Sequence, residues 1–363
     1  MKLKMLKIYN KLNFLFFESD NIKGHLKFLD GLRGIAVLFV ILAHSSNNNI
    51  MIHEKFNFYK SGKIGVYLFF CLSAFLISNQ IIYSFNQNKV NFYFWKRYFF
   101  RRFLRIYPLF FIALVSFYLL NLAGINTKIV DFTDIVNHLI LLKGDEIFWS
   151  IPVEFKFYIL LPAVLFFCHK YLCWKRLNLV LFFVFFLVII ILINKNFDLN
   201  IISTIKYLSF FIVGIIFSIY DFFKKDRGIS FKYLGLLSFL LIVLSIPHFF
   251  HYLFGFLGYN PINFRSTDFF IIYSFLWGFV IMASKEEKSI LNYFLKIRLL
   301  RFIGKISYSV YLFHLIPLYI VMQLKLSGSL KFFIFLMSTF IISSLSFLLI
   351  EKTLKNINKF NRI

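Results

Sequence analysis

Charged residues are scarce in this sequence, and acidic residues are the scarcest of them. Only 16% of the 363 residues are charged, with 16 Asp and Glu against 41 Lys and Arg. Hydrophobic residues make up 60% of the chain, and the mean hydropathy is +0.76. A soluble protein of this length needs far more polar surface, so a soluble fold is excluded.

Cysteine is also rare, which limits metal and redox chemistry. Cys71, Cys168 and Cys173 show no spacing typical of a metal site or a redox pair. Cys168 and Cys173 lie at one expected cytoplasmic helix end, so we expect free thiols. Residues 1–23 lack a continuous apolar region and a small-residue cleavage site, so we expect no cleaved signal peptide.

The chain does contain repeated apolar runs of about 17–22 residues, a length that crosses a bilayer as a helix. We predict an all-α polytopic integral membrane protein with about ten transmembrane helices. Its tails are residues 1–27 and 351–363, and its transmembrane domain is residues 28–350. No internal repeat, low-complexity linker or soluble domain is visible. The ten predicted spans are 28–46, 64–83, 106–123, 151–169, 177–193, 201–220, 233–250, 268–284, 302–322 and 332–350.

The distribution of basic residues predicts the orientation of the spans. Lys and Arg concentrate in both tails and in the segments 84–105, 170–176, 221–232 and 285–301, whereas the loop 124–150 carries four carboxylates. The positive-inside rule places the basic segments in the cytoplasm, so both termini are expected there. The same rule accounts for the net charge of +25, and we expect no nucleic-acid partner.

The first span, FLDGLRGIAVLFVILAHSS, carries Arg33 and His44. These residues are eleven positions apart, which is about three helical turns and about 16 Å, so they point in nearly the same direction. The predicted orientation places Arg33 near the cytoplasmic end and His44 near the outer end. Ionisable groups within spans usually face an interior cavity and mark a substrate path. Snorkelling or helix packing remains the alternative interpretation for both residues.

A basic cluster, RRFLRIYP, lies at the expected cytoplasmic mouth of the third span. Arg102 and Arg105 are i, i+3 neighbours on this helix. Arginine presents a rigid fork of donors that suits phosphate oxygens. Because Arg33 is expected at a similar depth, the three arginines indicate a site for a phosphate-bearing cytosolic cosubstrate. Ordinary positive-inside anchoring is the alternative.

The fourth span begins in WSIPVEFKFYILLP and places Glu154 at the outer side, at about the depth of His44. A carboxylate beside an imidazole fixes the tautomer and stabilises the protonated form, which is the arrangement of a general base. The alternatives are a Glu154–Lys156 pair at the interface and a carboxylate that simply lies at a span mouth.

The ninth span begins in GKISYSVYLFHLIP, which contains Ser307, Tyr308, Tyr311 and His314. His314 is expected in the middle of the membrane, where it needs a partner. Packing and interhelical hydrogen bonding are favoured over a direct chemical role.

Five of these segments, in order, resemble motifs of the acyltransferase-3 family, membrane O-acyltransferases that mostly acylate bacterial cell-surface glycans. FLDGLRGIAVLFVILAH resembles the opening motif of an arginine and a histidine separated by ten residues, and GVYLFFCLSAFLI is similar to GVxxFFxLSGFLI. RFLRIYP resembles the RxxR motif, WSIPVEFKFYILLP the segment with a serine and a glutamate, and GKISYSVYLFHLIP the late GxxSYxxYLxH segment. This chain departs from the family at Ala74, Tyr67 and Thr353, where glycine, an acidic residue and proline are common.

The resemblance implies an acyl-CoA donor, most often acetyl-CoA, and a glycan hydroxyl as the acceptor. Arg33, Arg102 and Arg105 would hold the donor, His44 would take the hydroxyl proton, and Glu154 would orient His44 or stabilise its charge. A direct transfer needs neither a metal nor a nucleophilic side chain, and an acyl-enzyme route remains open. The expected acceptor is a cell-surface or lipid-linked glycan such as O-antigen or capsule, modified at the bacterial cytoplasmic (inner) membrane.

The main alternative is a transporter or flippase of a lipid-linked sugar, which ten spans with buried charges permit. Transporters often show pseudo-repeated halves with broken helices, and no such symmetry is visible in this sequence. Some members of the family carry an additional extracytoplasmic hydrolase-like domain. This chain ends soon after the tenth span, so we expect no such domain, and transfer would be completed unaided or with a separate partner. The sequence does not indicate the acceptor hydroxyl or the oligomeric state.

Overall fold

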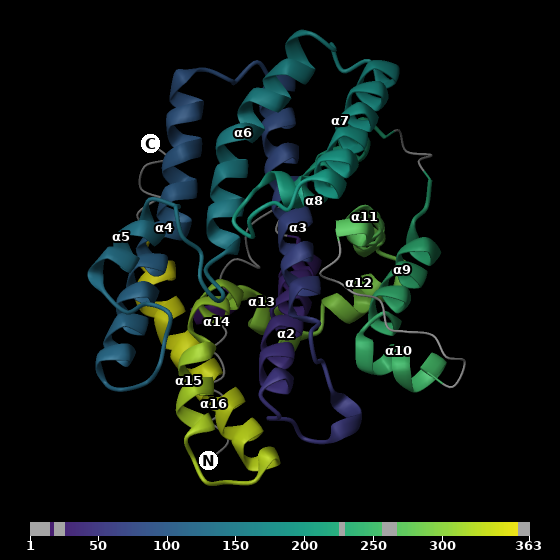
Figure 1. The fold of residues 1–363 in the computed structure, drawn as a ribbon. Coiled ribbons are helices and arrows are strands. Elements are labelled where there is room, and N and C mark those ends of the chain that lie inside the picture. Colours follow the sequence, from purple (N-terminus) through teal and green to yellow (C-terminus); the bar gives the residue numbers. More distant parts are fainter. Residues whose placement is uncertain (1–14, 18–25, 225–228, 256–266, 355–363) are drawn as a thin grey trace, which may run out of the picture.

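The computed structural model describes residues 15–17, 26–224, 229–255 and 267–354, and in these ranges it contains helices and no strands. Most of the long helices run alongside one another, and α3 connects the half of the molecule that contains α2 with the half that contains α6 and α7 (Figure 1). The helices are α2 (Lys27–Asn47), α3 (Gly62–Asn86), α4 (Phe92–Leu122), α5 (Phe132–Leu139), α6 (Ser150–Lys170), α7 (Arg176–Asn196), α8 (Leu208–Phe223), α9 (Lys232–Leu244), α10 (Pro247–Phe254), α11 (Phe270–Lys285), α12 (Ile290–Leu295), α13 (Arg298–Lys305), α14 (Ser307–Phe313), α15 (Leu315–Met322) and α16 (Gly328–Ser346). Short helical turns are η2 (Glu54–Phe56), η3 (Ile205–Tyr207), η5 (Thr267–Phe269) and η6 (Phe347–Glu351).

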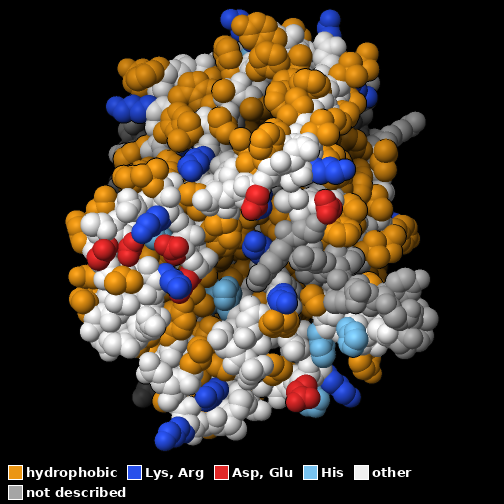
Figure 2. All heavy atoms as spheres, in the orientation of Figure 1, with side chains coloured by type: hydrophobic (Ala, Val, Ile, Leu, Met, Phe, Trp, Pro, Cys, Tyr) orange, Lys and Arg blue, Asp and Glu red, His pale blue; other side chains and the backbone are white. Residues whose placement is uncertain are grey.

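The predicted membrane fold is confirmed in class and in the position of its spans. Eight helices in the described ranges are long and apolar enough to cross a membrane, and two bent helix pairs raise the number to ten. Each of these ten overlaps one predicted span. Hydrophobic side chains cover the part of the molecule formed by α6 and α7, while charged side chains gather over α5 (Figure 2). The exposed apolar residues of α7 face outward, as expected for a helix in contact with lipid.

Two predicted spans are not continuous helices, which corrects the sequence analysis. The span predicted at 233–250 is divided into α9 and α10, which meet at 89°. Pro247 begins α10, and a proline disfavours helical backbone at the residue before it. The span predicted at 302–322 is bent by 61° between α13 and α14. α13 is basic along one side, and its Lys305 turns toward the buried Asp30 instead of continuing into an apolar span.

The first span, α2, lies at the centre of the packing because glycines bring its backbone against two neighbours. A Cβ added at Gly65 of α3 would lie 2.0 Å from the carbonyl oxygen of Ala36. On the other side, a Cβ at Gly304 of α13 would lie 1.6 Å from the carbonyl oxygen of Asp30, and one at Gly34 would lie 2.3 Å from that of Leu300. These contacts fix the rotation of α2 and therefore the direction in which its polar residues point.

Ala74, one of the departures from the family pattern, packs against α8. It is fully buried, and a Cβ added at Gly214 of α8 would lie 2.7 Å from the Cβ of Ala74. The extra methyl group of Ala74 is therefore accommodated opposite a glycine.

We predict that Gly304→Ala destabilises the protein, because its new Cβ would overlap backbone that cannot move independently of α2. Overpacking typically lowers the free energy of unfolding by about 1–3 kcal/mol. An overlap with backbone, which moves less readily than a side chain, is expected to cost about 3 kcal/mol or more. The measurement is the midpoint of thermal unfolding in detergent. Gly328→Ala is the matched control, since its Cβ would lie no closer than 3.6 Å to another atom. Equal midpoints for the two variants would contradict this account of the α2–α13 contact.

Candidate active site

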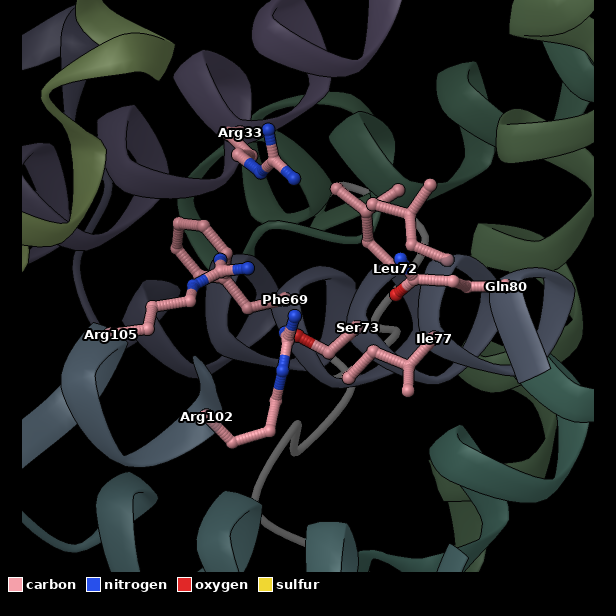
Figure 3. A pocket seen from close by; sticks show the side chains of 9 residues that line it. Arg33, Phe69, Leu72, Ser73, Ile77, Gln80, Arg102 and Arg105 are labelled. Carbon is pink, nitrogen blue, oxygen red and sulfur yellow. The ribbon is translucent and has the colours of Figure 1, made fainter. Parts of the chain in front are cut away.

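Three arginines from two helices converge on one cavity of about 210 Å³. Arg33 comes from α2, and Arg102 and Arg105 come from α4; their guanidinium groups point toward one another across α3 (Figure 3). The structure thus brings together the three arginines that the sequence analysis grouped. The remaining lining residues come from α3 and are Phe69, Leu72, Ser73, Leu76, Ile77 and Gln80. No carboxylate among the described residues lines this cavity, so its wall is strongly cationic.

Two of the three arginines contact groups that do not line the cavity. Arg33 lies 3.6 Å from a carboxylate oxygen of Asp30, and the second oxygen of Asp30 lies 3.7 Å from Nζ of Lys305. The guanidinium of Arg102 lies over the ring of Tyr158, 5.7 Å from the ring centroid. The Nε of Arg102 is buried and has no hydrogen-bond partner in the described part of the chain. A donor of this kind is available to an anionic ligand.

Glu154 lies beside the arginine cavity and not beside His44, where the sequence analysis placed it. Its Oε1 accepts hydrogen bonds from the hydroxyl of Tyr158 and from Oγ of Ser73, the latter at 2.6 Å. Ser73 lines the cavity, and Tyr158 carries Arg102 on its ring. Glu154 therefore connects the two groups that shape the cavity wall, and the expected pairing of Glu154 with the imidazole is replaced by these contacts.

The position of Glu154 follows from where α6 begins. The residues before this helix, Ile147, Phe148 and Trp149, are all buried, so the preceding loop enters the protein before the helix starts. The first residue of α6, Ser150, pairs its hydroxyl with that of Tyr311 at 2.8 Å. Glu154 follows one helical turn later, where its carboxylate contacts Ser73. The predicted span at 151–169 matches α6, but the burial of the residues before it was not predicted.

The loop between α5 and α6 is held by a buried histidine with a defined hydrogen-bond pattern. Nδ1 of His138 lies 2.7 Å from the carbonyl oxygen of Asp134, and its Nε2 accepts the backbone N–H of Asp145 at 3.0 Å. Burial lowers the pKa of His138, which favours the neutral ring that this pattern requires. A hydrogen bond from Lys143 lowers the pKa of Asp134. These contacts hold the loop and identify His138 as a structural residue.

His44 contacts a second imidazole, that of His314. The two ring centroids are 5.0 Å apart, and the ring planes are tilted by 58°. His44 is half-buried in the last turn of α2, whereas His314 is fully buried between α14 and α15. No sequence pattern predicted this pair. A histidine in the middle of an apolar span indicated that His314 needs a partner, but no local pattern identifies a residue 270 positions away.

Comparison with known proteins now gives the family context. Residues 26–350 match the family model described as "Acyltransferase domain", the acyltransferase-3 family. The chain is 24% identical to "O-acetyltransferase OatA" of Staphylococcus aureus, in an alignment that covers 94% of this chain and 59% of the relative. It is 30% identical to "Peptidoglycan O-acetyltransferase OatA" of Listeria monocytogenes over 38% of this chain and 24% of the relative. The chain thus spans about three fifths of the Staphylococcus aureus relative, and no solved structure matches it.

We predict that Asp30→Asn destabilises the protein, because it removes a buried carboxylate that lies between two cations. Breaking a buried ion pair by removing one partner costs on the order of 3 kcal/mol. The measurement is again the midpoint of thermal unfolding. Asp198→Asn is the matched control, since that carboxylate is fully exposed and lies 3.9 Å from Lys206. An Asp30→Asn variant as stable as the control would show that Asp30 does not balance the arginine and lysine charges.

Proposed function

This chain belongs to the acyltransferase-3 family, and we propose that it is a membrane O-acyltransferase. In this proposal it moves an acyl group, most often acetyl, from cytosolic acyl-CoA to a hydroxyl of a cell-surface or lipid-linked glycan. The proposed catalytic unit is the transmembrane domain, residues 28–350. The single observation that carries the proposal is a cationic cavity and a histidine on the same face of one unbroken helix, α2.

The cavity suits the phosphate groups of the donor. Three guanidinium groups without a lining carboxylate attract a polyanion, and charge-assisted hydrogen bonds to phosphate are among the strong ones. Pockets that enclose a drug-sized ligand measure about 300–1,000 Å³. At about 210 Å³ this cavity takes one anionic part of a larger ligand, with the remainder outside it. Coenzyme A has this composition, because its phosphates lie at the nucleotide end and a thin pantetheine arm extends away from them.

The helix α2 supplies the distance between the donor phosphates and the reaction. It is continuous from Lys27 to Asn47, so Arg33 and His44 are separated by about 16 Å along one face. The pantetheine arm of coenzyme A is long and thin enough to cover such a distance. The thioester then lies near His44 while the phosphates remain at the arginines. Positive-inside orientation places the arginines toward the cytoplasm, where acyl-CoA is found, and His44 toward the outer side.

The chemistry at His44 is general-base catalysis of acyl transfer. A neutral ring nitrogen of His44 takes the proton of the acceptor hydroxyl as the hydroxyl oxygen attacks the thioester carbonyl carbon. The new C–O bond forms, the C–S bond breaks, and the proton on His44 passes to the leaving thiolate. Glu154 acts at the arginine cavity as a positioning residue, because it fixes Ser73 and Tyr158 around the donor phosphates.

We predict that His44→Ala reduces acylation by about 100-fold or more, the usual contribution of a positioned general base. The measurement is the O-acetyl content of surface polysaccharide in cells that carry the variant as their only copy. His251→Ala is the control, since this exposed imidazole lies on α10, outside the site. Full acetylation by a well-expressed His44→Ala protein would reject His44 as the base.

We predict that Arg102→Ala and Arg105→Ala each weaken the binding of coenzyme A by about tenfold, because each removes a charged donor to phosphate. Binding is measured as thermal stabilisation of purified protein by coenzyme A and, in parallel, by pantetheine, which lacks the nucleotide phosphates. The loss is expected for coenzyme A alone. Arg176→Ala removes the same charge at the exposed start of α7 and is the control. Unchanged coenzyme A binding in both cavity variants would contradict the donor assignment.

A further inference from the structure

His314 presents a buried nitrogen that the proposed mechanism has not used. The residue has no exposed surface, and its Nε2 has no hydrogen-bond partner among the described residues. An unsatisfied buried acceptor costs about 1–3 kcal/mol. Such a group in a well-packed interior indicates a partner that arrives or turns during function.

The hydrogen bonds of His314 define which nitrogen carries its hydrogen. Nδ1 lies 2.9 Å from the carbonyl oxygen of Tyr311 and 3.1 Å from that of Val310. Both oxygens are acceptors, so Nδ1 must be the donor. A neutral imidazole with its hydrogen on Nδ1 has a bare lone pair on Nε2. The buried Nε2 is therefore a hydrogen-bond acceptor that an N–H or O–H group would satisfy.

The neighbours of His314 leave His44 as its donor. The ring of Tyr311 lies 6.3 Å from that of His314, but its hydroxyl donates to the carbonyl oxygen of Ile147 at 2.6 Å. The ring of His44 is closer, at 5.0 Å between centroids, a separation that accommodates one N–H···N hydrogen bond after a small rotation of either ring. His314 has no exposed surface, so it acts on a substrate through a neighbouring group, and His44 is the nearer of the two rings.

We propose that Nε2 of His314 accepts the N–H of His44 and so orients the catalytic base. This inference rests on the proposed function, in which His44 receives the hydroxyl proton. The hydrogen bond fixes the tautomer of His44, and the opposite ring nitrogen then presents its lone pair to the acceptor hydroxyl. When His44 takes the hydroxyl proton, its ring becomes a cation with two N–H groups. One N–H remains bonded to His314, and the other carries the proton that returns to the thiolate.

A neutral imidazole suits this position better than a carboxylate does. A carboxylate at a fully enclosed site must be paired with a charge to offset its desolvation, and His44 is neutral for most of the cycle. A neutral acceptor carries no such cost and still stabilises the imidazolium when it forms. The contacts of Glu154 with Ser73 and Tyr158 leave this role to His314.

The first test compares His314→Leu with His314→Gln in acyl-transfer kinetics. The Leu side chain removes the acceptor, and the Gln side chain restores a carbonyl oxygen near the position of Nε2. Supporting partners of a reacting group typically contribute 10–100-fold. We expect His314→Leu to lower kcat by that factor with an unchanged KM for acetyl-CoA, and His314→Gln to recover most of the loss. His169→Leu is the matched control, since that imidazole stacks on Phe85 at the other end of the molecule. Equal kcat values for His314→Leu and wild type would overturn the proposal.

The second test does not require activity, so it separates this inference from the proposed function. Membranes containing the ¹⁵N-histidine-labelled protein are examined by solid-state NMR, and the His44 signals are assigned by their loss in His44→Gln. We expect one neutral tautomer of His44 with a hydrogen-bonded N–H in the wild type, and a mixture of tautomers in His314→Leu. If His314→Leu does not fold, the His314 Nε2 signal in His44→Leu, which lacks a hydrogen-bond donor, replaces it and should move toward that of an unbonded nitrogen. Unchanged signals would refute the pairing whether or not the protein transfers acetyl groups.

Discussion

Three guanidinium groups share one cavity inside a membrane protein, and the arrangement of the site depends on how their charge is balanced. Two unit charges 4 Å apart interact by about 4 kcal/mol at the effective dielectric of a protein, so an uncompensated cluster would destabilise the fold. The balancing carboxylates lie behind the cavity wall. Asp30 faces Arg33, and Glu154 lies behind Ser73 and Tyr158. These two carboxylates offset part of the charge of the cluster while the cavity itself stays cationic, which suits the reversible binding of an anion.

The same carboxylate that balances Arg33 also fixes the helix that carries it. The carbonyl oxygen of Asp30 lies where a side chain at Gly304 would be, and its carboxylate lies 3.7 Å from Lys305. α2 is thus held against α13 by backbone contact and by charge, and against α3 by Gly65. Because α2 cannot rotate or slide between these neighbours, the separation of its arginine from its histidine is constant. The bend after Lys305 then brings α14 and His314 toward the C-terminal end of α2.

The features that the sequence predicted correctly are those that local physics determines. Apolar runs gave the positions of the spans, and eleven-residue and three-residue spacings placed the arginines and His44 on common helix faces. The errors concern where the chain enters the interior. Buried Phe148 and Trp149 before α6 moved Glu154 to the level of Ser73. The His44–His314 contact depends on the bend at Ile306, and this bend follows from tertiary contacts of Lys305 that no local pattern records.

In the proposed reaction, the charged arginines lie at a distance from His44, which takes the proton. This distance affects the free energy of proton transfer. A guanidinium and an imidazolium about 16 Å apart repel by about 1 kcal/mol at an effective dielectric of about 20, so the net positive charge that remains at the cavity opposes the protonation of His44 by an amount of this order. The phosphates of a bound donor cancel this repulsion. Proton transfer to His44 is then favoured when the cavity is occupied and opposed when it is empty. Because the helix between Arg33 and His44 is unbroken, an electrostatic coupling of this kind connects donor binding with the base without a change of shape.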